Sequence, residues 1–161
     1  MAIAWKLLAD VRERHQRSAL QAVGRDQRAL QACEALAGEA RQQWLQQHQA
    51  KAQHWQATTA ALGEGACSVA QMRQAGAWSH ALDARIAAAG TTVLQAQAVV
   101  AHAEGQLDAS RGQLRRASAE LEKARQMQQR DRAELRAQQE RRLDEATEEA
   151  SVQQWSAARR A

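Results

Sequence analysis

The chain has 161 residues, with 22 Lys and Arg against 18 Asp and Glu, and it lacks proline, tyrosine and phenylalanine. Alanine, glutamine, arginine, leucine and glutamate dominate it, which excludes a thick globular core and favours long helices. Cys33 and Cys67 lie far apart in the sequence, which predicts free thiols in a reducing compartment.

The first third carries a stripe that alternates by three and four residues, as a coiled-coil seam does. Its members are Ala19, Val23, Asp26, Leu30, Cys33, Ala37, Ala40 and Trp44. Upstream, Leu8, Val11 and His15 continue the stripe with one additional four-residue step, which predicts a stutter that locally unwinds the supercoil. We therefore expect a first helical arm over about residues 3–62.

Two glycines predict where the chain reverses. Gly63-Glu64-Gly65 brings two glycines within three residues, and glycine readily enters the left-handed backbone region that ends a helix. Ser68 is then expected to cap the next helix, because its hydroxyl can accept a hydrogen bond from a free amide of the first turn. We expect a turn at about 63–67 and a second arm over about 68–157. A reversal at Gly90-Thr91-Thr92 is the alternative.

The second arm has the most regular repeat of the sequence. Its stripe runs through Ala75, Trp78, Leu82, Ile86 and Ala89. Large residues then recur every seven positions at Val93, Val100, Leu107, Leu114 and Leu121, with Ala96, Ala103, Ser110, Ala117 and Ala124 between them. Together with Leu30 and Trp44 of the first arm, the large residues form the predicted seam. The expected fold is all-α, a single-domain antiparallel two-helix coiled-coil hairpin over residues 1–161.

The second arm is expected to outrun the first. A turn at Gly63 to Gly65 places residues opposite each other when their numbers add up to about 128, so that Leu30 lies near Val100. Residues after Gln128 then have no partner within the chain. They carry a loose apolar face, which either frays or binds another molecule. That face consists of Leu135, Leu143, Ala146, Val152 and Trp155.

The sequence offers no sign of catalysis. No nucleotide-binding, zinc-protease or nucleophile motif occurs, and the histidines do not have the spacing of a metal site. We therefore expect no enzyme activity and no cofactor. No apolar stretch is long enough to span a bilayer, and residues 1–10 lack the features of a secretion signal, which predicts a cytoplasmic protein.

Charge and tryptophan point to protein partners. Between Arg111 and Arg142, ten basic residues stand against five acidic ones. No aromatic residues are interleaved for base stacking, and no bulky apolar face lies opposite for a lipid surface, so neither nucleic acid nor membrane insertion is expected. Exposed tryptophan is typical of protein contacts. Trp55, Trp78 and Trp155 are the candidates, whereas Trp44 lies on the seam.

Three stretches resemble one family. They are the turn Leu62-Gly63-Glu64-Gly65, the string Trp78-Ser79-His80-Ala81-Leu82-Asp83-Ala84-Arg85-Ile86, and the charged stretch Glu140-Arg141-Arg142-Leu143-Asp144-Glu145-Ala146. Together they are similar to the FliJ/YscO family, the coiled-coil stalk proteins of bacterial type III export machines. Flagellar members tend to have Tyr or Phe where this chain has Trp, so the injectisome branch fits slightly better, and the choice between the two systems stays open.

The resemblance implies a function. Such a protein is the central stalk of a type III export ATPase complex. It inserts into the hexameric ATPase ring, links the ring to the cytoplasmic domain of the export gate, and promotes ring assembly and protein export. Export chaperones are further expected partners, and the protein would lie in the cytoplasm, peripheral at the inner-membrane export apparatus. The alternative is a generic coiled-coil adaptor or oligomerisation protein, and a binder of nucleic acid or of a membrane surface is a third possibility.

The resemblance also implies two contact surfaces. The gate contact would consist of Trp55, Trp78 and Leu82. The ATPase-ring contact would consist of Trp5, Leu8, Arg125, Arg130, Arg132, Leu135, Arg136 and Arg142.

Overall fold

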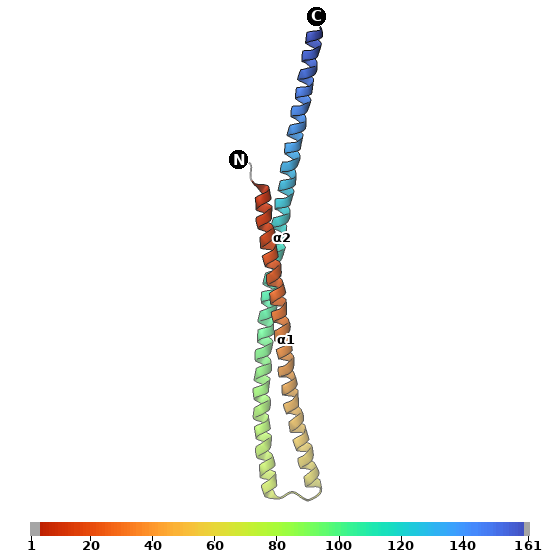
Figure 1. Cartoon of the computed structure of the whole chain (residues 1–161). Coiled ribbons are helices and arrows are strands. Elements are labelled where there is room, and N and C mark those ends of the chain that lie inside the picture. The colour runs from red at the N-terminus through yellow and green to blue at the C-terminus, as the bar shows by residue number, and fades with distance from the viewer. Residues whose placement is uncertain (1–3, 160–161) are drawn as a thin grey trace. The chain divides into compact units, whose positions relative to one another are not determined.

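The computed structural model describes residues 4–159, and within this range it consists of two helices and the link between them (Figure 1). Helix α1 spans Trp5–Gly63 and helix α2 spans Val69–Ala158. The helices run antiparallel and contact each other, so the predicted all-α two-helix hairpin is confirmed. Residue 3, where the sequence predicts the first helix to begin, lies outside the described residues.

Contacts between the helices gather in two units. In the first unit, the part of α1 up to Leu20 packs on the part of α2 that begins at Gly112. The second unit comprises Gln21–Arg111 and includes the turn, where the end of α1 and the start of α2 lie side by side (Figure 1).

The turn uses both of its predicted signals. Gly65 has a φ of 68°, in the left-handed region that side chains disfavour. The amide of Gln71 donates to the Ser68 hydroxyl at 3.3 Å, and the Ser68 amide donates to the Gln71 side-chain oxygen at 2.7 Å. This reciprocal pair is a capping box, which satisfies two amides at the start of α2. The alternative turn at residues 90–92 is wrong, because these residues lie inside α2.

The seam of the second unit follows the predicted spacing. Leu82 and Leu107 are only 3% and 4% exposed, and the large seam residues Leu30, Trp44, Val93 and Val100 are half-buried. One member of the predicted stripe is wrong. Trp78 is 47% exposed, and its neighbour Ser79 is buried instead. The step from Ala75 to the next seam residue is therefore four residues and not three.

The first unit continues the seam without a stutter. Leu121 and Ala124 of α2 are buried, Leu114 is half-buried, and on the α1 side Ala9 is buried. The α1 stripe runs on through two polar residues, Arg12 and Gln16, while His15 is exposed. Each polar residue is paired across the hairpin: Arg12 with Glu120 in an ion pair, and Gln16 with the Ser118 hydroxyl at 3.0 Å. The predicted stutter is wrong because Arg12 and Gln16 occupy the seam positions of α1, whereas the prediction placed Val11 and His15 on the stripe.

The register of the hairpin also differs from the prediction. A sum of about 128 would place residue 102 opposite Asp26, yet Asp26 accepts a hydrogen bond from Ser110. Lys51 likewise pairs with Asp83. The partner residues lie about one to two helical turns further along α2 than predicted. The cause is the position of the reversal, since α1 ends at Gly63 and α2 begins only at Val69.

Candidate protein-binding surfaces

The part of α2 beyond the seam is the largest exposed feature of the first unit. Gln128 and Asp131 are still half-buried, and every side chain from Arg132 to Trp155 is exposed. We call residues 132–158 the exposed arm. Among the described residues, the predicted lack of an intramolecular partner after Gln128 is thus confirmed, with the boundary three residues later. Its large apolar side chains Leu135, Leu143, Val152 and Trp155 are 52%, 66%, 64% and 61% exposed.

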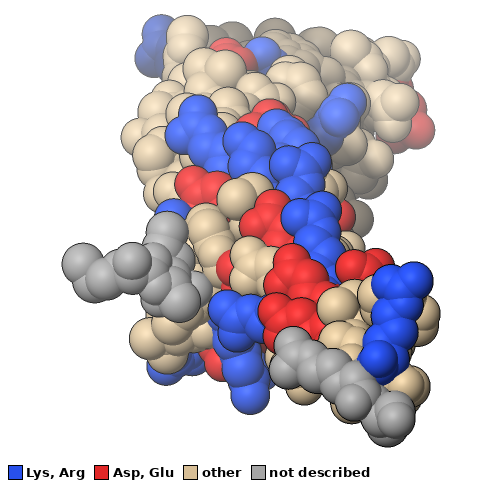
Figure 2. Space-filling view, turned by 90° about the horizontal axis from the view of Figure 1, so that it is seen from above, with Lys and Arg blue, Asp and Glu red and all other residues tan. Residues whose placement is uncertain are grey.

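The exposed arm has an uneven charge distribution. Its first half carries Arg132, Arg136, Arg141 and Arg142 together with Glu134 and Glu140. Its second half carries Asp144, Glu145, Glu148 and Glu149. None of the ion pairs found among residues 4–159 joins two of these side chains. Figure 2 shows basic and acidic side chains next to one another on the face seen from above. The arm therefore presents charges of both signs to solvent.

The residues assigned to the ATPase ring all lie in the first unit. Trp5 and Leu8 are half-buried, and they line a hollow with Arg12, Glu120, Lys123, Ala124 and Met127. The other six are exposed: Arg125, Arg130, Arg132, Leu135, Arg136 and Arg142. The structure thus brings this predicted set into one unit.

The residues assigned to the export gate lie in the second unit, and they do not share one surface. Trp55 and Trp78 are 41% and 47% exposed, on α1 and α2 respectively. Leu82 is 3% exposed, so its assignment to a contact surface is wrong. A side chain that packs between the two helices has no surface left for a partner.

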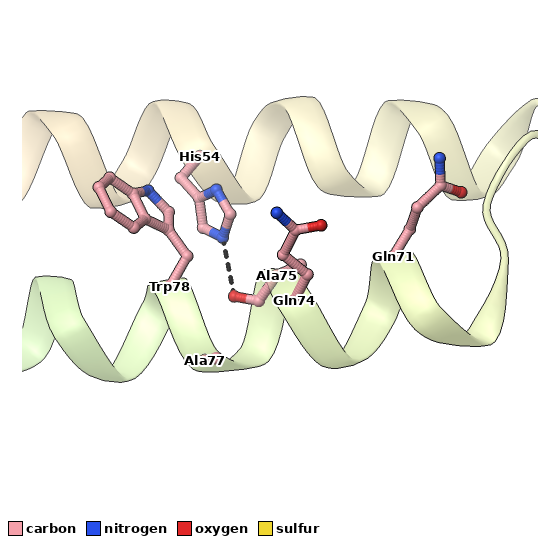
Figure 3. Close-up of a pocket in the computed structure, with 6 residues that line it drawn as sticks. All are labelled: His54, Gln71, Gln74, Ala75, Ala77 and Trp78. Carbon is pink, nitrogen blue, oxygen red and sulfur yellow. Dashed lines mark hydrogen bonds between the residues drawn. The ribbon is translucent and has the colours of Figure 1, made fainter.

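Trp78 lies at a pocket near the turn (Figure 3). The pocket holds about 540 Å³ and is lined by His54 of α1 and by five residues of α2: Gln71, Gln74, Ala75, Ala77 and Trp78. The ring nitrogen Nε2 of His54 lies 3.1 Å from the carbonyl oxygen of Ala75, to which it donates (Figure 3). The Arg85 guanidinium lies 5.3 Å from the centre of the Trp78 ring. The pocket therefore presents an indole ring together with two amide side chains.

Trp44 has the structural role that its seam position predicts. Its indole packs edge-on against His48, with 4.3 Å between ring centres. On α2 it faces Gly90, where an added Cβ would lie 3.5 Å from the indole nitrogen. Trp44 is partly covered in this way, in keeping with a structural role.

The sequence reading missed the polar pairs that cross the hairpin. Arg12, Gln16 and Lys51 pair with residues of α2 that the predicted register placed elsewhere. Their signal was present, because all three continue the three-and-four spacing of the stripe. Seam positions are usually occupied by apolar side chains, so polar residues at this spacing are easily overlooked.

Within residues 4–159, no group of three or more His, Cys, Asp or Glu could hold a metal ion. In the same range, neither helix contains a segment that is long and apolar enough to cross a bilayer. Cys33 and Cys67 are both half-buried, free thiols.

No family model, curated protein or solved structure matches this chain. The resemblance to the FliJ/YscO family therefore depends on the three sequence stretches alone.

Proposed function

We propose that the chain is the central stalk of a bacterial type III protein export ATPase complex. The supporting observation is the exposed arm, a helical segment with no partner in the part of the chain that the structure describes, in the same unit as Trp5 and Leu8. In the FliJ/YscO family the end of the hairpin that bears both termini enters the ATPase ring. The exposed arm is the matching segment of this chain.

The charges of the exposed arm suit a part that moves inside a ring. Its arginines and carboxylates are solvated and unpaired with one another. An exposed ion pair with a charged loop of the ring is worth about 1 kcal/mol or less. Many such contacts hold a rod in a channel without locking it in one orientation.

The second contact of the stalk would be made by the second unit. Trp55 and Trp78 keep enough exposed indole surface to bind the cytoplasmic domain of the export gate. Leu82 is removed from this surface and is a core residue. Export chaperones are further proposed partners, and the proposed location is the cytoplasmic side of the inner membrane.

The test is ATP hydrolysis and ring assembly of a type III export ATPase, with and without a molar excess of the chain. We expect stimulated hydrolysis and more hexamers. Truncation after Asp131 should abolish both effects, since it removes the exposed arm. The double variant Arg132→Glu/Arg136→Glu should weaken them.

The matched control is Arg28→Glu/Arg73→Glu, which makes the same charge change on exposed residues of the second unit. This control should stimulate the ATPase as the natural chain does. Equal stimulation by the truncated chain, or no stimulation by the natural chain, would contradict the proposal.

The exposed apolar side chains of the arm favour one other candidate function. Leu135, Leu143, Val152 and Trp155 are all more than half exposed, as expected for a helix that binds another coiled coil. A generic coiled-coil adaptor would show self-association or partner binding and would not affect the ATPase.

A further inference from the structure

The seven-residue repeat of α2 does not end where α1 ends. At one seam position Leu114 and Leu121 are followed by Gln128, Leu135, Arg142 and Glu149. At the companion position Ala117 and Ala124 are followed by Asp131, Gln138, Glu145 and Val152. The seam is covered as far as Asp131 and exposed from Leu135 onward. Six seam residues of the exposed arm therefore have no partner among residues 4–159: Leu135, Gln138, Arg142, Glu145, Glu149 and Val152.

The six seam residues of one arm are complementary to the same six residues of a second arm that runs in the opposite direction. An antiparallel pairing of two arms about a two-fold axis, between residues 143 and 144, sets Leu135 opposite Val152. The same pairing sets Gln138 opposite Glu149, an amide donor against a carboxylate acceptor. It also sets Arg142 opposite Glu145, a cation against an anion. Each seam residue of one arm thus faces a residue of the second arm with which it can form a favourable contact.

The residues beside the seam also favour an antiparallel pairing, and a parallel pairing would be unfavourable. In an antiparallel coiled coil the positions beside the seam also pair, which brings Arg141 close to Glu148 of the second arm. A parallel pairing would instead set Arg142 against Arg142 and Glu145 against Glu145. Like charges in direct opposition are destabilising, so the charge distribution selects the antiparallel orientation.

We propose that the exposed arm binds the exposed arm of a second copy of this chain, antiparallel and about a two-fold axis. The interface continues the seam that α1 covers in the first unit, and it is isologous, with the same surface contributed by both copies. The proposal concerns the free chain and does not depend on the export-stalk function.

The composition of the seam makes this dimer weak and sensitive to salt. Only Leu135 and Val152 of the six seam residues are apolar, so little apolar surface is buried. The other seam contacts are between polar or charged side chains, and exposed ion pairs are screened at high ionic strength. Association should therefore fall as salt is added, whereas purely apolar adhesion would not weaken.

The experiment is sedimentation equilibrium of the full chain over a range of concentrations, at low and at high salt. Arg142→Glu and Glu145→Arg should each raise the dimer dissociation constant at least about tenfold. The swap Arg142→Glu/Glu145→Arg should return it to near the natural value, because opposite charges again face each other. An equimolar mixture of the two single variants should form a heterodimer for the same reason.

The matched control is Arg136→Glu, which makes the same charge change one position past the seam residue Leu135. It should leave the dissociation constant within about threefold of the natural value, and circular dichroism should show the same helical content for all variants. A natural chain that stays monomeric at low salt would overturn the proposal. So would a dimer that survives both single variants, or a swap variant that stays monomeric, since a parallel pair repels in that variant too.

Discussion

Ser110 of α2 donates a hydrogen bond from its hydroxyl to the carboxylate of Asp26 of α1. Both residues belong to the seam of the second unit, where the Asp26 side chain is 19% exposed and Ser110 is 8% exposed. This pair places a polar layer in the seam beside apolar residues such as Leu30 and Leu107. It therefore helps to select one register.

Removing one member of this pair should destabilise the hairpin. Ser110→Ala is expected to lower the free energy of unfolding by about 1–3 kcal/mol, because it leaves a mostly covered carboxylate without its donor. The double variant Asp26→Leu/Ser110→Ala should recover the loss, since both polar partners are then gone. Urea unfolding followed by helical circular dichroism measures both. Ser151→Ala on the exposed arm is the control and should have little effect; a loss as large as that of Ser110→Ala would contradict the assignment.

Two leucines of α2 should respond differently to the same substitution. Leu82→Ala is expected to lower the free energy of unfolding by about 2–4 kcal/mol, because it opens a cavity in the seam. Leu94→Ala should change it by less than about 0.5 kcal/mol, since Leu94 is 68% exposed. The same urea titration compares them. Equal losses would show that Leu82 does not lie in the core.

The two glycines of the turn should also differ. Gly65→Ala is expected to cost about 1–2 kcal/mol, because its φ of 68° strains any residue with a Cβ. Gly63 is the last residue of α1, has no positive φ, and has no atom near a Cβ added to it. Gly63→Ala should leave stability unchanged or raise it by up to about 1 kcal/mol. Thermal unfolding followed by circular dichroism measures both changes. A Gly65→Ala variant as stable as the natural chain would mean that the turn has another geometry.

The capping box at the start of α2 should contribute measurably. Ser68→Ala is expected to cost about 1 kcal/mol, because the amide of Gln71 loses its acceptor. Thr59→Ala is the control, since the Thr59 hydroxyl is exposed and bonds only to carbonyls of its own helix. Amide hydrogen exchange of the first turn of α2 should accelerate in the Ser68 variant alone. Unchanged exchange there would show that the cap is dispensable.

Much of the fold could be predicted because its causes are local. The absence of proline allows helices of 59 and 90 residues, and the glycine pair with Ser68 marks the reversal. The spacing of Val93, Val100, Leu107, Leu114 and Leu121 identifies the face that packs on α1. Helix propensity, capping and periodicity are properties of short stretches of chain, so they can be read from the sequence.

The candidate surfaces were only partly predictable. The lack of a partner beyond Gln128 followed from the unequal lengths of the two arms. The burial of Leu82 agrees with the predicted stripe, and only the resemblance assigned this residue to a contact surface. The exposure of Trp78 did not follow from the stripe, because Ala75 is followed by a possible seam residue at either a three- or a four-residue step. A short stretch of alternating residues cannot distinguish these two phases.

The register was decided by contacts between residues far apart in the sequence. A seam rich in alanine buries similar apolar areas when one helix shifts past the other by a turn, so the apolar pattern alone does not select a register. The polar pairs do, because each one is satisfied in a single alignment: Arg12 with Glu120, Gln16 with Ser118, and Asp26 with Ser110. Helices, turn and seam spacing follow from the sequence by itself, whereas the alignment of the two helices depends on which polar side chains meet across the hairpin.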